Sequence, residues 1–327
     1  MISNAKNLNR VTIASLLVAL GIIYGDIGTS PLYVLKAVIG ERRIDETLVY
    51  GGVSLIFWTL VFQTTIKYII LTIRADNQGE GGVFSLYALV RRYGKWLAIP
   101  TILGATTLLA DGIITPPISV ASAIEGLNSV KGLEHIIVPG NNLSIGIVIA
   151  IISALFFFQR FGTQVVGSSF GPIMAIWFVM LFAVGAAQIA HYPDVLKAIS
   201  PHYGYNLLVH YPHGFWLLGA VFLCTTGAEA LYSDLGHCGI KNIRITWIFV
   251  KISLVVNYIG QAAWIMNLKT SGLNGLNPFF EMMPHWFLIP SIIIATAATI
   301  IASQALISGS FTLVSEAMNL NFWPRVT

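Results

Sequence analysis

Long apolar stretches separated by short polar segments dominate the pattern of this chain. A helix needs about 20 predominantly apolar residues to cross the hydrocarbon core of a bilayer, and eight stretches approach or exceed that length. The pattern therefore predicts an all-α, polytopic membrane protein. The eight predicted spans lie near residues 11–38, 50–73, 96–125, 143–159, 165–189, 214–237, 246–268 and 286–315.

The composition supports the same fold class. Hydrophobic residues make up 56% of the chain and charged residues 10%, whereas soluble domains carry about 25% charged residues. The basic residues are spread over short loops, which excludes a nucleic-acid partner and leaves the lipid bilayer. The only two cysteines, Cys224 and Cys238, lack the spacing of a disulfide framework or a zinc site.

The distribution of positive charge predicts the orientation of the spans. If the spans alternate strictly, ten Lys and Arg residues fall on the side of the N-terminus and five on the opposite side. Cytoplasmic loops carry the excess of Lys and Arg in multi-pass membrane proteins. The N-terminus is therefore predicted to be cytoplasmic.

A carboxylate interrupts the first apolar stretch. Asp26 lies within the segment Tyr24–Tyr33 (YGDIGTSPLY), where two glycines and Pro31 surround it. An Asp at the centre of a spanning helix costs about 2.5–3.5 kcal/mol, so such residues usually mark an ion or substrate path. Gly and Pro at this point predict a broken helix with freed backbone groups that a ligand can satisfy. These features together indicate a transporter.

The sixth stretch repeats part of the first. Gly28–Tyr33 and Gly227–Tyr232 both follow the pattern Gly-x-x-x-Leu-Tyr, and Glu229 supplies a second carboxylate within a span. Five spans separate the two segments, so they enter the membrane from opposite sides. This predicts an inverted repeat with broken helices 1 and 6 and a substrate between them.

The repeat also predicts the domain organisation. The whole chain, 1–327, is expected to form one transmembrane transport domain, with a first five-helix repeat at 11–189 and an incomplete second repeat at 214–327. Two five-helix repeats require ten spans, and only eight are present. Either the architecture differs, or the sequence is a fragment truncated after about eight spans; we favour the fragment.

The third stretch supplies a row of oxygen groups. If a helix continues through Pro116 and Pro117, then Asp111, Thr115 and Ser119 lie on one face, four residues apart. Such an all-oxygen surface suits a hard cation, which needs several oxygens to replace its hydration shell. Further hydroxyl groups near Asp26 and Glu229 come from Tyr33, Thr225 and Thr226.

Several carboxylates near one site also suggest a role for protons. They cannot all stay ionised in a low dielectric, because desolvation and mutual repulsion favour the protonated form. Proton exchange at one of them would couple cation movement to protons. The alternative is that these acids pair with Lys or backbone amides and only pack helices, and this applies most to Glu125 and Asp234, near the ends of spans.

Three other function classes fit the sequence less well. An amino-acid carrier on the same fold would place Asp26 beside a substrate carboxylate, which it would repel unless it held the amine. A membrane scaffold would leave Asp26 and Glu229 without a purpose. An enzyme is not expected, since no nucleophile–base pair is evident and His210-x-x-His213 lacks a third metal ligand.

Six ordered motifs resemble the KUP/HAK/KT potassium-uptake permeases, and they cover nearly the whole chain. They are Tyr24–Tyr33 (YGDIGTSPLY), Gln78–Gly82 (QGEGG), Asp111–Ser119 (DGIITPPIS), Ala123–Leu127 (AIEGL), Thr226–Tyr232 (TGAEALY) and Ala302–Gly309 (ASQALISG).

The resemblance implies a LeuT-like fold of the amino acid–polyamine–organocation (APC) superfamily. It also implies potassium uptake across the plasma membrane by proton-coupled symport and alternating access, without a cofactor. It assigns proton coupling to Asp26, Glu125 and Glu229. Family members have about twelve spans and a C-terminal cytosolic domain, which is absent here, and homodimerisation of the intact protein stays open. The residues implied around the potassium site are Asp26, Tyr33, Asp111, Thr115, Ser119, Thr226 and Glu229.

Overall fold

The structure is a computed structural model that describes residues 11–77, 79–132, 140–159, 164–268 and 271–324. Within these ranges the regular elements are helices, apart from one isolated bridge between Asn77 and Glu80. The longer helices are α2 (Ile13–Ile23), α5 (Glu46–Thr59), α6 (Val83–Val90), α7 (Ala98–Glu125), α8 (Asn142–Gln159), α9 (Gln164–His191), α10 (Pro201–His210), α14 (Ile240–Asn267) and α16 (Leu288–Asn319).

Seven of the eight predicted spans correspond to candidate spans in the described residues. Among the described residues, six helical segments are long and apolar enough to cross a membrane, or seven if one bent pair counts as a single span. The predicted span at 143–159 forms α8, but its apolar part, Asn142–Phe157, is shorter than the 18 residues that the other segments reach. Within the described residues, the chain is thus an all-α polytopic membrane protein with six or seven candidate spans.

The first span is broken where the sequence predicts it. Helix α2 ends at Ile23, and the segment Gly25–Leu32, which begins with α3 (Gly25–Thr29), follows in a direction bent by 72°. A short 3-10 turn, η1 (Ser30–Leu32), then leads into α4 (Val34–Ile39). Pro31 has no amide hydrogen, which favours an end to regular helical bonding here. The prediction of a broken first helix is confirmed.

The sixth apolar stretch is also interrupted. Helix α11 (Leu217–Phe222) continues into the 3-10 turn η9 (Leu223–Thr225), which ends at Thr225. Helical structure resumes only with α12 (Ala230–Ser233) and α13 (Leu235–Cys238). The four residues between them form a turn that includes Glu229.

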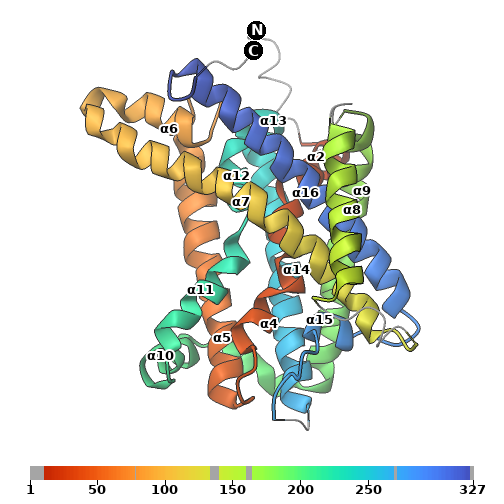
Figure 1. The fold of residues 1–327 in the computed structure, drawn as a ribbon. Helices are drawn as coiled ribbons and strands as arrows, with labels where there is room; N and C mark the ends of the chain where they lie inside the picture. The colour runs from red at the N-terminus through yellow and green to blue at the C-terminus, as the bar shows by residue number, and fades with distance from the viewer. Residues whose placement is uncertain (1–10, 78, 133–139, 160–163, 269–270, 325–327) are drawn as a thin grey trace.

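Two long helices cross the others obliquely. Figure 1 shows α7 and α16 running diagonally over the face of the molecule, in front of the more upright α5 and α14. Helix α9 packs against α2 and α14. A Cβ atom added at Gly260 of α14 would lie 2.5 Å from Gly185 Cα of α9, so small residues allow this close helix contact.

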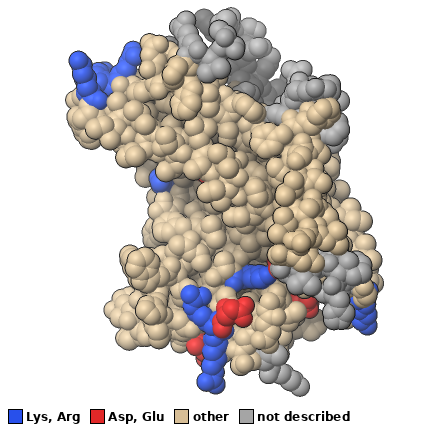
Figure 2. Space-filling view, viewed as in Figure 1, with Lys and Arg blue, Asp and Glu red and all other residues tan. Residues whose placement is uncertain are grey.

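On one face of the molecule, charged side chains gather towards the two ends (Figure 2). On the face shown in Figure 2, the band between the ends is almost free of Lys, Arg, Asp and Glu, as a bilayer requires. The predicted cytoplasmic N-terminus stays a prediction. Five of the basic residues on which that prediction rests lie outside the described residues, namely Lys6, Arg10, Arg160, Lys269 and Arg325.

Candidate cation site

Three carboxylates from separate segments meet at the two helix breaks. Asp26 belongs to α3, Asp111 to α7, and Glu229 to the turn before α12. One oxygen of each carboxylate lies within 4.8 Å of the others. Residues more than 200 positions apart are thereby joined into one group, which we call the carboxylate triad.

Asp26 is the most deeply placed member of the triad. Its exposed fraction is 4%. Neither of its carboxylate oxygens has a hydrogen-bond partner among the residues that the structure describes. An ionised carboxylate in such surroundings is costly unless a positive charge compensates for it. Asp26 is therefore suited to hold a cation or a proton.

Gly227 brings the sixth stretch close to Asp26. Its φ of +79° lies in the left-handed region, which glycine adopts without strain. A Cβ atom at this position would lie 2.6 Å from Asp26 Cβ and 2.8 Å from its Oδ2. Glycine is therefore required at this position, both by the positive φ and by the close approach to Asp26. Glu229 follows two residues later.

Helix α7 continues through Pro116 and Pro117, as the one-face prediction requires. The Thr115 hydroxyl donates to Asp111 Oδ1 at 2.6 Å. Thr115 and Ser119 are both buried, with exposed fractions of 4% and 1%. Within the described part of the chain, Ser119 Oγ has no hydrogen-bond partner. The helix thus presents a row of oxygens that begins at the triad.

Three hydroxyl groups form a second cluster beside the triad. The Tyr33 and Thr226 hydroxyl oxygens lie 3.1 Å apart. Ser30 Oγ lies 3.3 Å from the Tyr33 oxygen and 3.2 Å from the Thr226 oxygen. Ser30 is absent from the residues predicted from the sequence. The available signal was its position one helical turn after Asp26.

The carbonyl groups of the broken first helix are less free than predicted. The break was expected to expose carbonyl oxygens to a ligand, yet three of them accept hydrogen bonds from side chains of other segments. The donors are Trp177 to Gly28 O (2.9 Å), Gln261 to Pro31 O (2.9 Å) and Asn277 to Leu32 O (3.0 Å). Side-chain oxygens therefore supply most of the candidate site.

Glu125 lies apart from the triad. It is the last residue of α7, and its Oε1 forms an ion pair with Lys36. Its Oε2 accepts a hydrogen bond from Asn277 at 3.2 Å. Both carboxylate oxygens are therefore engaged by the protein. This arrangement matches the packing alternative that the sequence left open for Glu125.

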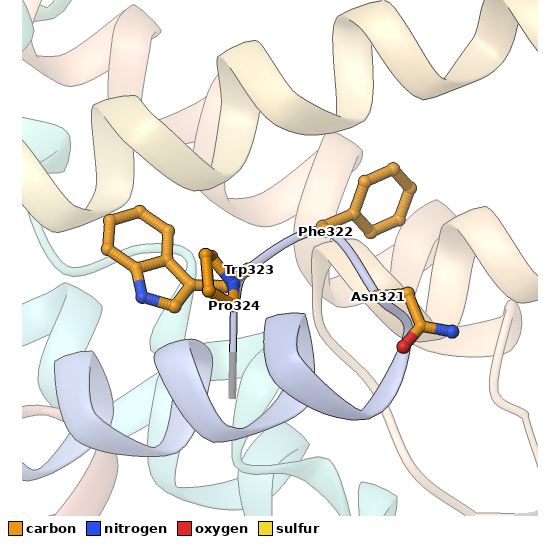
Figure 3. Close-up of a pocket in the computed structure, with 4 residues that line it drawn as sticks. All are labelled: Asn321, Phe322, Trp323 and Pro324. Atoms are coloured by element: carbon orange, nitrogen blue, oxygen red, sulfur yellow. The ribbon is translucent and has the colours of Figure 1, made fainter. Parts of the chain in front are cut away.

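A surface hollow at the C-terminal end of α16 does not include the predicted site. Four consecutive residues, Asn321–Pro324, line it (Figure 3). Phe322 packs against Phe84 and Tyr87 with ring centroids 5.7 and 5.2 Å apart. Phe322 thus links the end of α16 to α6. No residue of the triad lines the hollow.

The chemistry of the candidate site favours a hard monovalent or divalent cation. Every predicted ligand atom is an oxygen, and three of the groups are carboxylates. Hard cations prefer carboxylate, hydroxyl and carbonyl oxygens over nitrogen or sulfur.

Comparisons with known proteins identify the relatives of this chain. Residues 13–327 match the model of a family described as "K+ potassium transporter integral membrane domain". The chain is 59% identical to the "Probable potassium transport system protein Kup" of Cytophaga hutchinsonii, over 99% of this chain and 49% of the relative. It is 56% identical to the protein of the same name from Flavobacterium johnsoniae, over 100% and 50%.

A more distant relative of that name, from Enterococcus faecalis, is 48% identical over 100% of this chain and 51% of its own length. The chain thus spans about half the length of the curated relatives it matches. No solved structure matches it.

Proposed function

The chain belongs to the K+ potassium transporter family, and on that premise we propose that it carries the potassium site of a transporter in the cell membrane. This family consists of transporters and not of enzymes, in line with the sequence prediction. The observation that carries the proposal is the carboxylate triad, in which Asp26 is buried without a partner in the described chain. An amino-acid carrier has no support from this family.

The proposed potassium site combines the triad with neighbouring hydroxyl groups. Three carboxylates supply the charge that offsets dehydration of the ion, and hydroxyls complete its oxygen shell. Thr115 holds Asp111 in place, and the Tyr33–Thr226 contact joins the two broken helices. The proposed ligands are Asp26, Tyr33, Asp111, Thr115, Ser119, Thr226 and Glu229.

We further propose a LeuT-like inverted-repeat fold. Residues 11–189 would form the first repeat and 214–327 an incomplete second one. Each begins with a broken span, continues with an upright helix (α5 or α14) and then with an oblique one (α7 or α16). The two broken spans meet where Gly227 contacts Asp26. This similarity of order supports the repeat.

Proton coupling follows from the concentration of negative charge. Without potassium, three carboxylates within 4.8 Å repel one another strongly, so proton binding stabilises the empty site. Exchange of a proton for potassium at Asp26 or Glu229 would couple the two ions during alternating access from the two sides of the membrane. Glu125 stays a prediction from the resemblance, because it contacts Lys36 and not the triad.

Thermal unfolding of the purified chain in detergent tests the proposal. Potassium at 100 times its dissociation constant stabilises the folded state by about 2.7 kcal/mol if it binds only that state. We expect potassium to raise the midpoint more than sodium does. The rise should shrink at low pH, because protons compete for the carboxylates. A cooperative transition with no response to potassium at any pH would contradict a site formed by this chain.

A further inference from the structure

A partly buried ion-pair group joins three segments at the end of α7. Lys36 of α4 pairs with Glu125, and their side chains are 29% and 13% exposed. Asn277, which precedes α15 (Pro278–Glu281), donates both to Glu125 Oε2 at 3.2 Å and to Leu32 O at 3.0 Å. We call Lys36, Glu125 and Asn277 the Glu125 latch.

The latch differs from the other ion pair recorded in the described chain. Lys197 and Asp194 lie three residues apart and are 61% and 66% exposed. An exposed pair of this kind contributes little, because water and salt screen it. The latch instead links residues 89 positions apart and engages both oxygens of its carboxylate. It fixes the relative position of separate segments.

Those segments carry the two sides of the proposed potassium site. Tyr33 and Lys36 lie about one turn apart in the C-terminal part of the broken first span. Asp111 and Glu125 both belong to α7. Asn277 binds the carbonyl of Leu32, the residue before Tyr33. A second link, from Ser129 to Glu281 at 2.8 Å, ties the segment after α7 to α15.

We propose that Lys36 and Asn277, acting through Glu125, are positioning residues that hold α4 against α7 and close the potassium site towards this end of the molecule. Release of the ion pair lets α4 move away and opens the site. Alternating access proceeds by rocking or gating of one repeat against the other around the site, and release of the latch permits such a movement. The inference rests on the proposed function only in taking the triad as the potassium site.

The test measures access to the site with a thiol reagent. Ser119→Cys places a thiol on α7 between Asp111 and Glu125, where the side chain is 1% exposed. The native Cys224 and Cys238 are buried, with exposed fractions of 0% and 3%. We therefore expect little labelling of these two thiols. Maleimide labelling of the purified chain is followed in the Ser119→Cys background, alone and combined with Lys36→Gln, Lys36→Arg or Lys197→Gln.

We expect Lys36→Gln to raise the labelling rate at least about tenfold, which corresponds to about 1.4 kcal/mol in the opening equilibrium. Lys36→Arg keeps the charge and should label close to the parent rate. Lys197→Gln removes the cation of the exposed pair and should change nothing. An unchanged rate in a folded Lys36→Gln variant would overturn the proposal.

A charge exchange separates positioning from simple destabilisation. Lys36→Glu and Glu125→Lys should each raise the rate, and the double variant should return it towards the parent value. If neither single variant folds, the double variant decides: parent-like labelling supports the latch, and fast labelling or failure to fold overturns it. Labelling is measured without potassium, so failure of the latch and failure of the potassium site are distinguishable.

Discussion

Asp26 and Glu125 are two acids within apolar helices, and their surroundings differ. Asp26 is 4% exposed, and neither of its oxygens has a partner in the described part of the chain. Glu125 has a partner for each oxygen, Lys36 and Asn277. A paired acid can serve packing, whereas an unpaired one requires a cation or a proton. On this difference rests our proposal that Asp26 is a ligand of the transported ion and that Glu125 is not.

The largest effect should come from Asp26→Asn. We expect the potassium-induced rise in the unfolding midpoint to disappear, with affinity reduced at least about 100-fold, or about 2.7 kcal/mol. The midpoint without potassium should not fall, since the amide removes a charge that has no partner among the described residues. Thermal unfolding with and without potassium measures both. A rise equal to that of the parent chain would remove Asp26 from the site.

Glu125→Gln should give the opposite result. The chain should lose about 1–3 kcal/mol of stability, because Lys36 and Asn277 lose a charged partner. The potassium-induced rise should persist, since the triad is untouched. Asp194→Asn, in the exposed pair, serves as the control and should be nearly neutral. Loss of the potassium response in Glu125→Gln would instead assign Glu125 to the ion path.

Gly227→Ala tests the close contact with Asp26. Gly275 is the matched control. Its φ of +80° is within a degree of that of Gly227, but no atom lies within 4 Å of a Cβ added at Gly275. Both variants should lose about 1–3 kcal/mol from backbone strain, and Gly227→Ala should lose more because its Cβ would overlap with Asp26. Only Gly227→Ala should also weaken the potassium response. Equal responses in the two variants would show that the contact with Asp26 is irrelevant to binding.

The smallest effect should come from Thr115→Val, which removes the donor to Asp111. We expect about fivefold weaker potassium binding, or about 1 kcal/mol, as for one hydrogen bond. Thr107→Val is the control on the same helix, since the Thr107 hydroxyl is exposed and bonds only to carbonyls of its own helix. A potassium titration of the unfolding midpoint compares the two. Equal shifts would contradict a role for Thr115.

The sequence predicted the helix breaks because Gly, Pro and Asp act locally. It also predicted that Asp111 and Thr115 share a face, since helical periodicity fixes that relation. It could not show that Lys36 reaches Glu125, because this contact depends on how α4 packs against α7. For the same reason, Ser30 was missed. Its hydroxyl acquires a role only when Thr226 is brought beside it.

The most direct test of the potassium site is a crystal structure of the chain soaked in thallium, which replaces potassium and scatters anomalously. We predict an anomalous peak bounded by carboxylate oxygens of Asp26, Asp111 and Glu229. The peak should disappear in Asp26→Asn. Strong peaks elsewhere in the chain, with none at the triad, would contradict the account.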